Sequence, residues 1–239
     1  MPRTLPIAPL SFFITTSLLL SLIFSVSFLA PAFAARYYEE QTDFTETQVP
    51  TSGFTWSDNL QVCIFKQTGI PNSYYVWAKL AVQEWRQALR EYTSNPQGWT
   101  MTARYSPNES HMEGCNVRVH IYQNYKDFPG YPSQTGAYTA VQYTGGDAES
   151  ANVYLSQVVL HGDGKTEIKL PDYAFRNSAE HEMGHVLGLA HMKKEKGYLM
   201  SPVFDYYDNH DQLPITTLEL STLVRLYGTD GFERTVSIS

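Results

Sequence analysis

Three histidines lie within eleven residues of one another in the stretch HEMGHVLGLAH, residues 181–191. The whole chain of 239 residues has only seven histidines, so the stretch is strongly enriched in this residue type. His181 and His185 are four residues apart, and on a helix this spacing places both imidazoles on one face, within reach of one metal ion. The pattern therefore indicates a metal site that still needs a third ligand.

His191 can supply that ligand only if the helix ends before it. On a continuous helix, His191 would lie about 15 Å further along the axis than His181 and could not bind the same ion. Gly188 lies between them, and glycine adopts left-handed dihedrals at little cost and commonly ends helices. We therefore expect the helix to stop at Gly188 and the chain to turn, which brings His191 to the metal.

Three neutral imidazoles with one open coordination position are typical of catalytic zinc, whereas structural zinc sites usually have four protein ligands. Zinc lowers the pKa of a bound water to about 7 and polarises a carbonyl oxygen. Glu182 adjoins His181 and can act as the general base that takes a proton from this water and delivers it to the leaving amine. The stretch therefore predicts metal-assisted hydrolysis of an amide, with Glu182 as the catalytic residue.

Other interpretations of the stretch exist. A bare H-E-x-x-H arises by chance, but the longer H-E-x-x-H-x-x-G-x-x-H fixes five residues, which makes chance a poor explanation. Two alternative functions stay open. One is a zinc amidase that acts on a non-protein amide, such as a cell-wall crosslink, and the other is an exported binding domain with a structural zinc.

The elements that must position these residues follow from hydrophobic periodicity. Strands are expected at 60–66, 100–105, 117–122, 136–144 and 151–160, and helices at 74–92, from 172 into the motif, and at 217–227. Thr216 and Glu219 have the spacing of a capping box at the start of the last helix. His120 alternates with apolar residues of its strand and is expected to be an ordinary outward-facing residue. The order of elements indicates an α+β domain.

The N-terminal residues indicate export. An uncharged apolar run at 11–30 precedes Ala32-Phe33-Ala34, which is typical of a signal peptide covering residues 1–34. An uncleaved anchor facing outward is the alternative, because the run approaches the ~20 residues that span a bilayer. Residues 35–52 are polar and acidic, which favours a flexible leader or short pro-segment before a catalytic domain at 53–239.

Composition and cysteine content agree with an exported globular protein. The residues are 43% hydrophobic, which supports a core, and the net charge of −7 disfavours nucleic acid as a partner. The two cysteines, Cys63 and Cys115, lie in strand-like segments, and an exported compartment permits a disulfide between them. Two buried free thiols are the alternative. We expect a monomer with a protein or peptide substrate.

The stretches HEMGHVLGLAH and GYLMSP, residues 197–202, resemble the metzincin metallopeptidases, and within them the matrixin-like group. In this family a methionine lies in a tight turn beneath the metal, and Met200, nine residues after His191, matches it. The resemblance covers roughly 53–230. It implies a secreted zinc endopeptidase with the metzincin fold: a mixed, twisted five-stranded sheet, two long helices and a small C-terminal subdomain with one helix.

The resemblance also implies where substrate and further ions bind. Substrate would add as an extended strand to the edge of 136–143, beside Ala137 and Tyr138, and Pro202 and Phe204 would line the pocket past the scissile bond. The loop Gly145–Ala148 is similar to a calcium loop of the family, although a plain turn is the alternative. Two features depart from matrixins: no cysteine precedes Cys63 to block the zinc, and Met192 stands where serine is favoured.

Overall fold

The computed structural model describes residues 36–41, 49–130, 136–161, 164–193, 197–202 and 212–232. The expected signal peptide at 1–34, much of the leader, and Phe204 lie outside these ranges. Among the described helices, none combines the length and the apolar character that crossing a membrane requires.

Six strands form one mixed sheet in the order β2-β1-β3-β5-β4, with β6 paired to β5. Their bounds are β1 (Leu60–Lys66), β2 (Met101–Ser106), β3 (Val117–Asn124), β4 (Ala137–Thr144), β5 (Asp147–Leu160) and β6 (Glu167–Lys169). The pairs β1–β2, β1–β3 and β3–β5 are parallel, whereas β4 and β6 run antiparallel to β5. Among the described strands, β4 pairs with β5 alone and so forms an edge of the sheet.

The structure confirms the α+β class and corrects the strand count. Each of the five predicted strands is present, but the three-residue strand β6 makes a sixth. A segment of three residues is too short to show the alternation from which strands are predicted. The helices are α1 (Asn72–Thr93), α2 (Asp172–Val186) and α3 (Thr217–Tyr227), and the short 3-10 helices are η1 (Glu109–His111) and η2 (Tyr125–Asp127).

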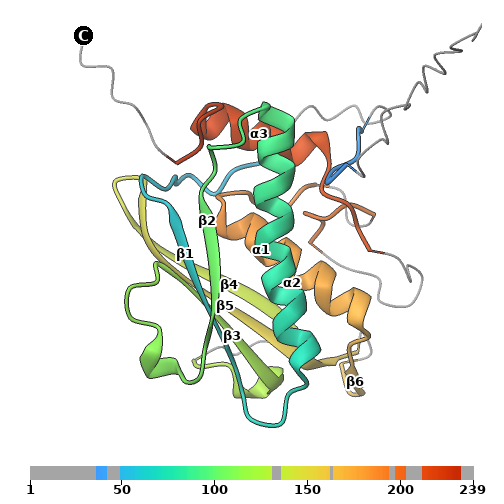
Figure 1. Ribbon diagram of the computed structural model, residues 1–239. Helices are drawn as coiled ribbons and strands as arrows, with labels where there is room; N and C mark the ends of the chain where they lie inside the picture. Colours follow the sequence, from blue (N-terminus) through green and yellow to red (C-terminus); the bar gives the residue numbers. More distant parts are fainter. Residues whose placement is uncertain are drawn as a thin grey trace, which may run out of the picture. The chain divides into compact units, whose positions relative to one another are not determined.

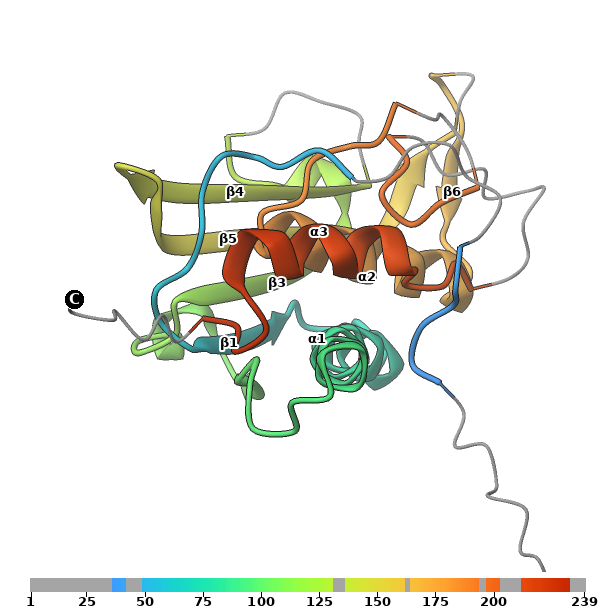
Figure 2. The ribbon, with the colours of Figure 1, turned by 90° about the horizontal axis from the view of Figure 1, so that it is seen from above.

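Helices α1 and α2 lie over the same face of the sheet, as Figures 1 and 2 show. Trp85 of α1 is fully buried, and Val117 and Ile121 of β3 point toward the helices and are equally buried. Helix α3 contributes Leu220 and Leu223 to this same core. Its capping box is confirmed. The Thr216 side chain accepts a hydrogen bond from a backbone N–H of the first turn, and the Glu219 carboxylate accepts one from the Thr216 N–H at 2.9 Å. The core therefore holds α2 against α1 and against strands β4 and β5.

The opposite face of the sheet is covered near His120, and the prediction of an ordinary outward-facing residue there is wrong. His120 is only 8% exposed. Its ring stacks on Tyr154 of β5, and its Nδ1 lies 3.2 Å from the Glu109 carboxylate of η1. The sequence showed which face His120 occupies but not that η1 folds over it.

The predicted disulfide between Cys63 and Cys115 is present, with an S–S distance of 2.09 Å. It joins β1 to the residues just before β3, and its sulfurs pack with Met112 in a small buried cluster. The cross-link therefore holds the loop that carries η1 against the sheet.

The described parts of the expected leader are hydrogen-bonded to the rest of the domain. Glu39 donates its backbone N–H to Ile215 and accepts from Thr217, which forms a bridge at the start of α3. Tyr38 packs edge-on against Tyr92 of α1. Residues 36–41 therefore lie along α1 and α3.

Candidate metal centre

Helix α2 ends where Gly188 was predicted to end it. The last helical residue is Val186, and Gly188 has the left-handed φ of +98°. Its N–H donates to the His185 carbonyl at 3.0 Å, and the Leu189 N–H donates to the Gly184 carbonyl at 3.0 Å. These two bonds form a Schellman motif, which terminates the helix and satisfies two of its free carbonyls.

Residues from distant parts of the chain satisfy the next carbonyls of α2. The indole N–H of Trp56 donates to the Val186 carbonyl at 2.7 Å, and the Tyr227 hydroxyl donates to the Leu187 carbonyl at 2.9 Å. A Cβ on Gly188 would lie 3.0 Å from the Phe54 carbonyl oxygen, so the turn has little room for a side chain. The end of the helix is thereby fixed in both its dihedrals and its packing.

The segment between the turn and His191 pairs with the end of the expected leader. Ser52 donates its N–H to the Gly188 carbonyl at 2.8 Å, and Ala190 donates to the Pro50 carbonyl at 2.7 Å. Thr51 and Leu189 form an antiparallel bridge at this point. This pairing directs the chain back beneath α2 and delivers His191 to the pair on the helix.

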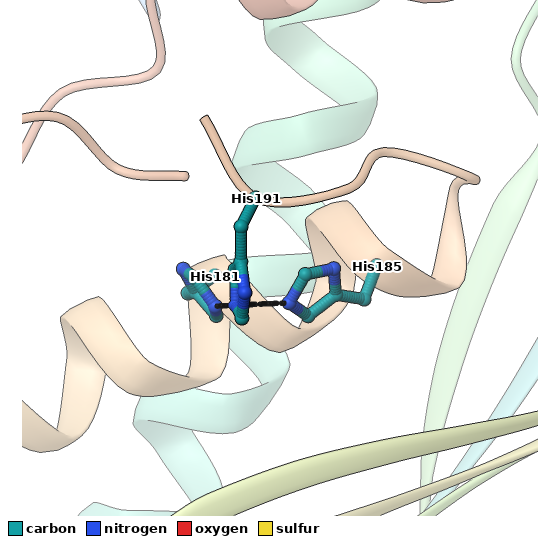
Figure 3. A group of neighbouring side chains, drawn as sticks. All are labelled: His181, His185 and His191. Atoms are coloured by element: carbon teal, nitrogen blue, oxygen red, sulfur yellow. Dashed lines mark hydrogen bonds between the residues drawn. The ribbon is translucent and has the colours of Figure 1, made fainter. Parts of the chain in front are cut away.

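The three histidine side chains converge, as Figure 3 shows. The Nε2 atoms of His181 and His185 are 3.0 Å apart, and each lies 3.1 Å from the Nε2 of His191. Among the described residues, this trio is the one group of histidine, cysteine and acidic side chains whose ligand atoms lie close enough together to hold a metal ion. The predicted convergence of three imidazoles on one point is therefore present.

The Nδ1 atoms of two of these rings are hydrogen-bonded to backbone carbonyls. His181 Nδ1 donates to the Leu199 carbonyl at 2.6 Å, and His185 Nδ1 donates to the Leu189 carbonyl at 2.8 Å. A carbonyl only accepts, so the single proton of each neutral ring lies on Nδ1 and each Nε2 presents a lone pair. The 3.0 Å contact between these two Nε2 atoms consequently has no hydrogen in it, which disfavours the arrangement unless a cation lies between them.

The surroundings keep the rings neutral. Burial, and then the neighbouring His185, lower the pKa of His181 to about 3, and burial lowers the pKa of His185 to about 4. Burial also lowers the pKa of His191, the most exposed of the three. Deprotonated imidazoles are the form that binds metals.

The donor set fits zinc. Bonds of about 2.1 Å in tetrahedral geometry separate two ligand nitrogens by about 3.4 Å, close to the observed separations. The carbonyls that receive the Nδ1 protons act as the outer-shell partners that usually orient metal-binding histidines. Three nitrogens and no fourth protein ligand in the described cluster leave room for water or substrate.

Glu182 lies beside the trio and is 5% exposed. Burial raises the pKa of its carboxyl to about 7, although a hydrogen bond from Thr139 of β4 opposes part of this shift. The Thr139 hydroxyl donates to Glu182 Oε2 at 2.6 Å. A carboxyl whose pKa lies near neutrality can both accept and return a proton at physiological pH.

Met200 lies in a turn packed against α2. Its carbonyl accepts the N–H of Met192 at 2.8 Å, and it is fully buried. A Cβ on Gly184 would lie 2.5 Å from the Met200 sulfur, so only glycine between the two helical histidines allows this close approach. The preceding residue, Leu199, supplies the carbonyl that orients His181.

The four residues expected to bind substrate are placed as follows. Ala137 and Tyr138 begin β4, the edge strand that carries Thr139. The Tyr138 ring, however, stacks on Tyr154 on the face of the sheet away from Glu182, so only its backbone is available on the side of the trio. Pro202 is exposed after the methionine turn, and Phe204 lies outside the described residues.

The loop suggested for calcium is a turn between β4 and β5. Asp147 accepts a hydrogen bond from Ser57 at 3.1 Å, and it forms a backbone bridge with Thr55. Gly145 and Gly146 both have positive φ, as a tight hairpin turn requires. These contacts give the loop the shape of a hairpin turn.

Sequence reasoning missed Thr139, Trp56 and Tyr227. Thr139 was inside a predicted strand, and the alternation of that strand could have indicated a polar residue on the helix side. Trp56 and Tyr227 carried no local signal, because their acceptors at 186 and 187 are 130 and 40 residues away.

Neither a protein-family model nor a curated protein matches this chain.

Proposed function

We propose that this chain is an exported zinc-dependent endopeptidase of the metzincin type, similar to matrixins. The observation that carries the proposal is the convergence of three Nε2 atoms within 3.1 Å, with a buried glutamate adjoining the first histidine. Three metal-directed imidazoles and one carboxyl of near-neutral pKa are the groups that hydrolysis of a peptide bond requires.

In this proposal His181, His185 and His191 hold the zinc. The ion, when bound, supplies a Lewis acid that activates water and stabilises negative charge on the carbonyl oxygen. Glu182 accepts the proton of the attacking water and returns it to the leaving amine. The edge strand β4 pairs with the extended substrate through its backbone at Ala137 and Tyr138.

The remaining features of the proposal concern the chain as a whole. Residues 1–34 act as a signal peptide, and the disulfide agrees with an oxidising compartment. The α+β domain with its edge strand and methionine turn agrees with the metzincin fold. We propose a secreted monomer that acts on proteins or peptides.

Metal analysis of the purified protein, together with digestion of casein and gelatin at neutral pH, tests the proposal. We expect about one zinc per chain and cleavage that a chelator abolishes. Glu182→Ala should retain zinc and lose hydrolysis by about 10²–10⁴-fold, the usual contribution of a general base. Glu149→Ala, which removes an exposed carboxylate of β5, is the matched control and should retain activity.

Two outcomes would contradict the proposal in different ways. Zinc without cleavage of either protein, but with hydrolysis of a cell-wall amide, would indicate an amidase. Zinc without any turnover would indicate a binding domain, and full activity of Glu182→Ala would remove the assigned base.

A further inference from the structure

The side chain of Thr139 joins the edge strand of the sheet to the proposed base. Thr139 is the third residue of β4, and its Oγ1 lies 2.6 Å from Glu182 Oε2 and 3.3 Å from the Glu182 carbonyl oxygen. A hydroxyl has one proton to donate, and the shorter distance assigns it to Glu182 Oε2. The carboxylate therefore accepts a strong hydrogen bond from Thr139. Within the described part of the chain, Thr139 is the side chain that hydrogen-bonds this carboxyl.

We infer that Thr139 is a positioning residue that holds one oxygen of Glu182 and leaves the other free to exchange a proton with water. This inference rests on the proposed function of Glu182 as the base. A glutamate side chain has several rotatable bonds, and a base is effective only when it lies within hydrogen-bond reach of the proton it takes. Fixing Oε2 on a β-branched residue with few rotamers removes this freedom.

The position of Thr139 also couples the base to substrate binding. Side chains alternate along a strand, and Tyr138 stacks on Tyr154 on one face while Thr139 reaches Glu182 on the other. The same three residues, 137–139, therefore present a backbone edge for an extended peptide and a side chain for the base. A peptide that pairs with β4 is consequently held in a fixed register relative to Glu182, because one strand positions both.

Replacement of the hydroxyl by a methyl group tests the inference. Thr139→Val keeps the volume and the branched shape but removes the donor, and Thr139→Ser keeps the donor. We expect Thr139→Val to lower kcat about 10- to 100-fold, less than loss of the base itself, with KM and zinc content unchanged. Thr139→Ser should recover most of the lost kcat. Thr144→Val, at the exposed end of the same strand, is the matched control and should have no effect.

Crystal structures of the wild type and of Thr139→Val provide a readout that does not depend on turnover. We expect the Glu182 carboxylate to be ordered in the wild type and to occupy other rotamers in the valine variant. Wild-type kcat in Thr139→Val, or an unmoved carboxylate, would overturn the inference while the proposed peptidase stands. If the wild type does not cleave peptides, the proposed function fails, and the two structures still decide whether Thr139 positions Glu182.

Discussion

The N-terminal half of α2, taken as residues 172–180, carries the buried Glu180 and the half-buried Arg176, and the C-terminal half, residues 181–186, carries the buried His181 and Glu182 and the half-buried His185. In the first half, Arg176 donates to Glu180 at 3.0 Å and also pairs with Glu84 of α1. The single guanidinium compensates the charge of the two carboxylates in part, and burial and the neighbouring Glu84 raise the pKa of Glu180 well above its usual value. In the second half, the described partners of the carboxyl and the imidazoles are a hydroxyl and backbone carbonyls, which carry no charge.

This difference separates a structural cluster from a reactive one on the same helix. The ion-paired cluster supplies a cation from within the chain, and removing that cation leaves uncompensated buried charge. The imidazole trio is incomplete, because the Nε2 lone pairs of His181 and His185 face each other at 3.0 Å. Its compensating charge must come from outside the chain, so perturbations of the two halves should affect different measurements.

The largest effect is expected from His185→Ala. Loss of one of three ligands should lower zinc affinity by more than about 100-fold, beyond the effect of losing an outer-shell partner, and should abolish hydrolysis with it. Zinc titration with a competing chelator measures the affinity. His111→Ala, which removes an exposed histidine of η1, should leave affinity unchanged. Equal affinity in both variants would show that the trio is not the metal site.

Arg176→Met should have the next largest effect, and on stability rather than on metal. The variant lacks the cation that pairs with the half-buried Glu84 and the fully buried Glu180. Loss of this compensating charge should lower the free energy of unfolding by about 3 kcal/mol. Denaturant unfolding measures this loss, and zinc affinity of the folded variant should remain that of the wild type. Arg86→Met, which removes a half-buried arginine of α1 bonded to the Met101 carbonyl, is the control and should cost far less. A strong loss of zinc affinity in Arg176→Met would erase the distinction between the two halves.

The two halves also differ in how far the sequence predicted them. The trio, Glu182 and the bend at Gly188 were predicted because all lie within eleven residues, where helix geometry fixes their relations. The pair of Arg176 with Glu84 spans 92 residues, so nothing local indicated it. The contact of Thr139 with Glu182 likewise depends on how β4 packs against α2, which periodicity alone does not specify.

The same reasoning applies to the fold. Helix α3 was predicted to the residue because its capping box, Thr216 with Glu219, is a local signal. Strand β1 was also predicted to the residue from its alternation. The order of strands in the sheet and the burial of His120 depend on long-range pairing and on the fold of η1, so they became known only from the structure.

Gly188→Ala disturbs the turn that leads to His191 and leaves the ion pairs of Arg176 in place, so it separates the two halves of α2 further. An alanine at φ +98° costs about 1–2 kcal/mol, and its Cβ would crowd the Phe54 carbonyl at 3.0 Å. We expect this loss of stability together with weaker zinc binding, because the segment 188–190 moves with the turn. Gly130→Ala has a positive φ of 66° and open space around it, so it should lose stability without any change in zinc affinity. Identical zinc affinity in both variants would mean that the turn does not position His191.

Glu219→Gln is expected to have the smallest effect, and it tests whether burial without a cation is enough to raise the pKa of a carboxyl away from the metal site. Glu219 is fully buried, and burial raises its pKa despite the hydrogen bonds of the capping box. In the folded state Glu219 therefore keeps its proton to a higher pH than in the unfolded state. The stability of the wild type consequently falls as pH rises from the ordinary glutamate pKa of about 4.3 through the folded value.

In Glu219→Gln, the glutamine keeps the capping acceptor but does not ionise. The stability of the variant relative to wild type should thus increase over this window, by an amount on the order of 1 kcal/mol, the usual size of a single-residue change. Thermal unfolding at a series of pH values measures the difference, and a difference that stays constant with pH would show that hydrogen bonding, rather than burial, sets the pKa of a carboxyl in this core.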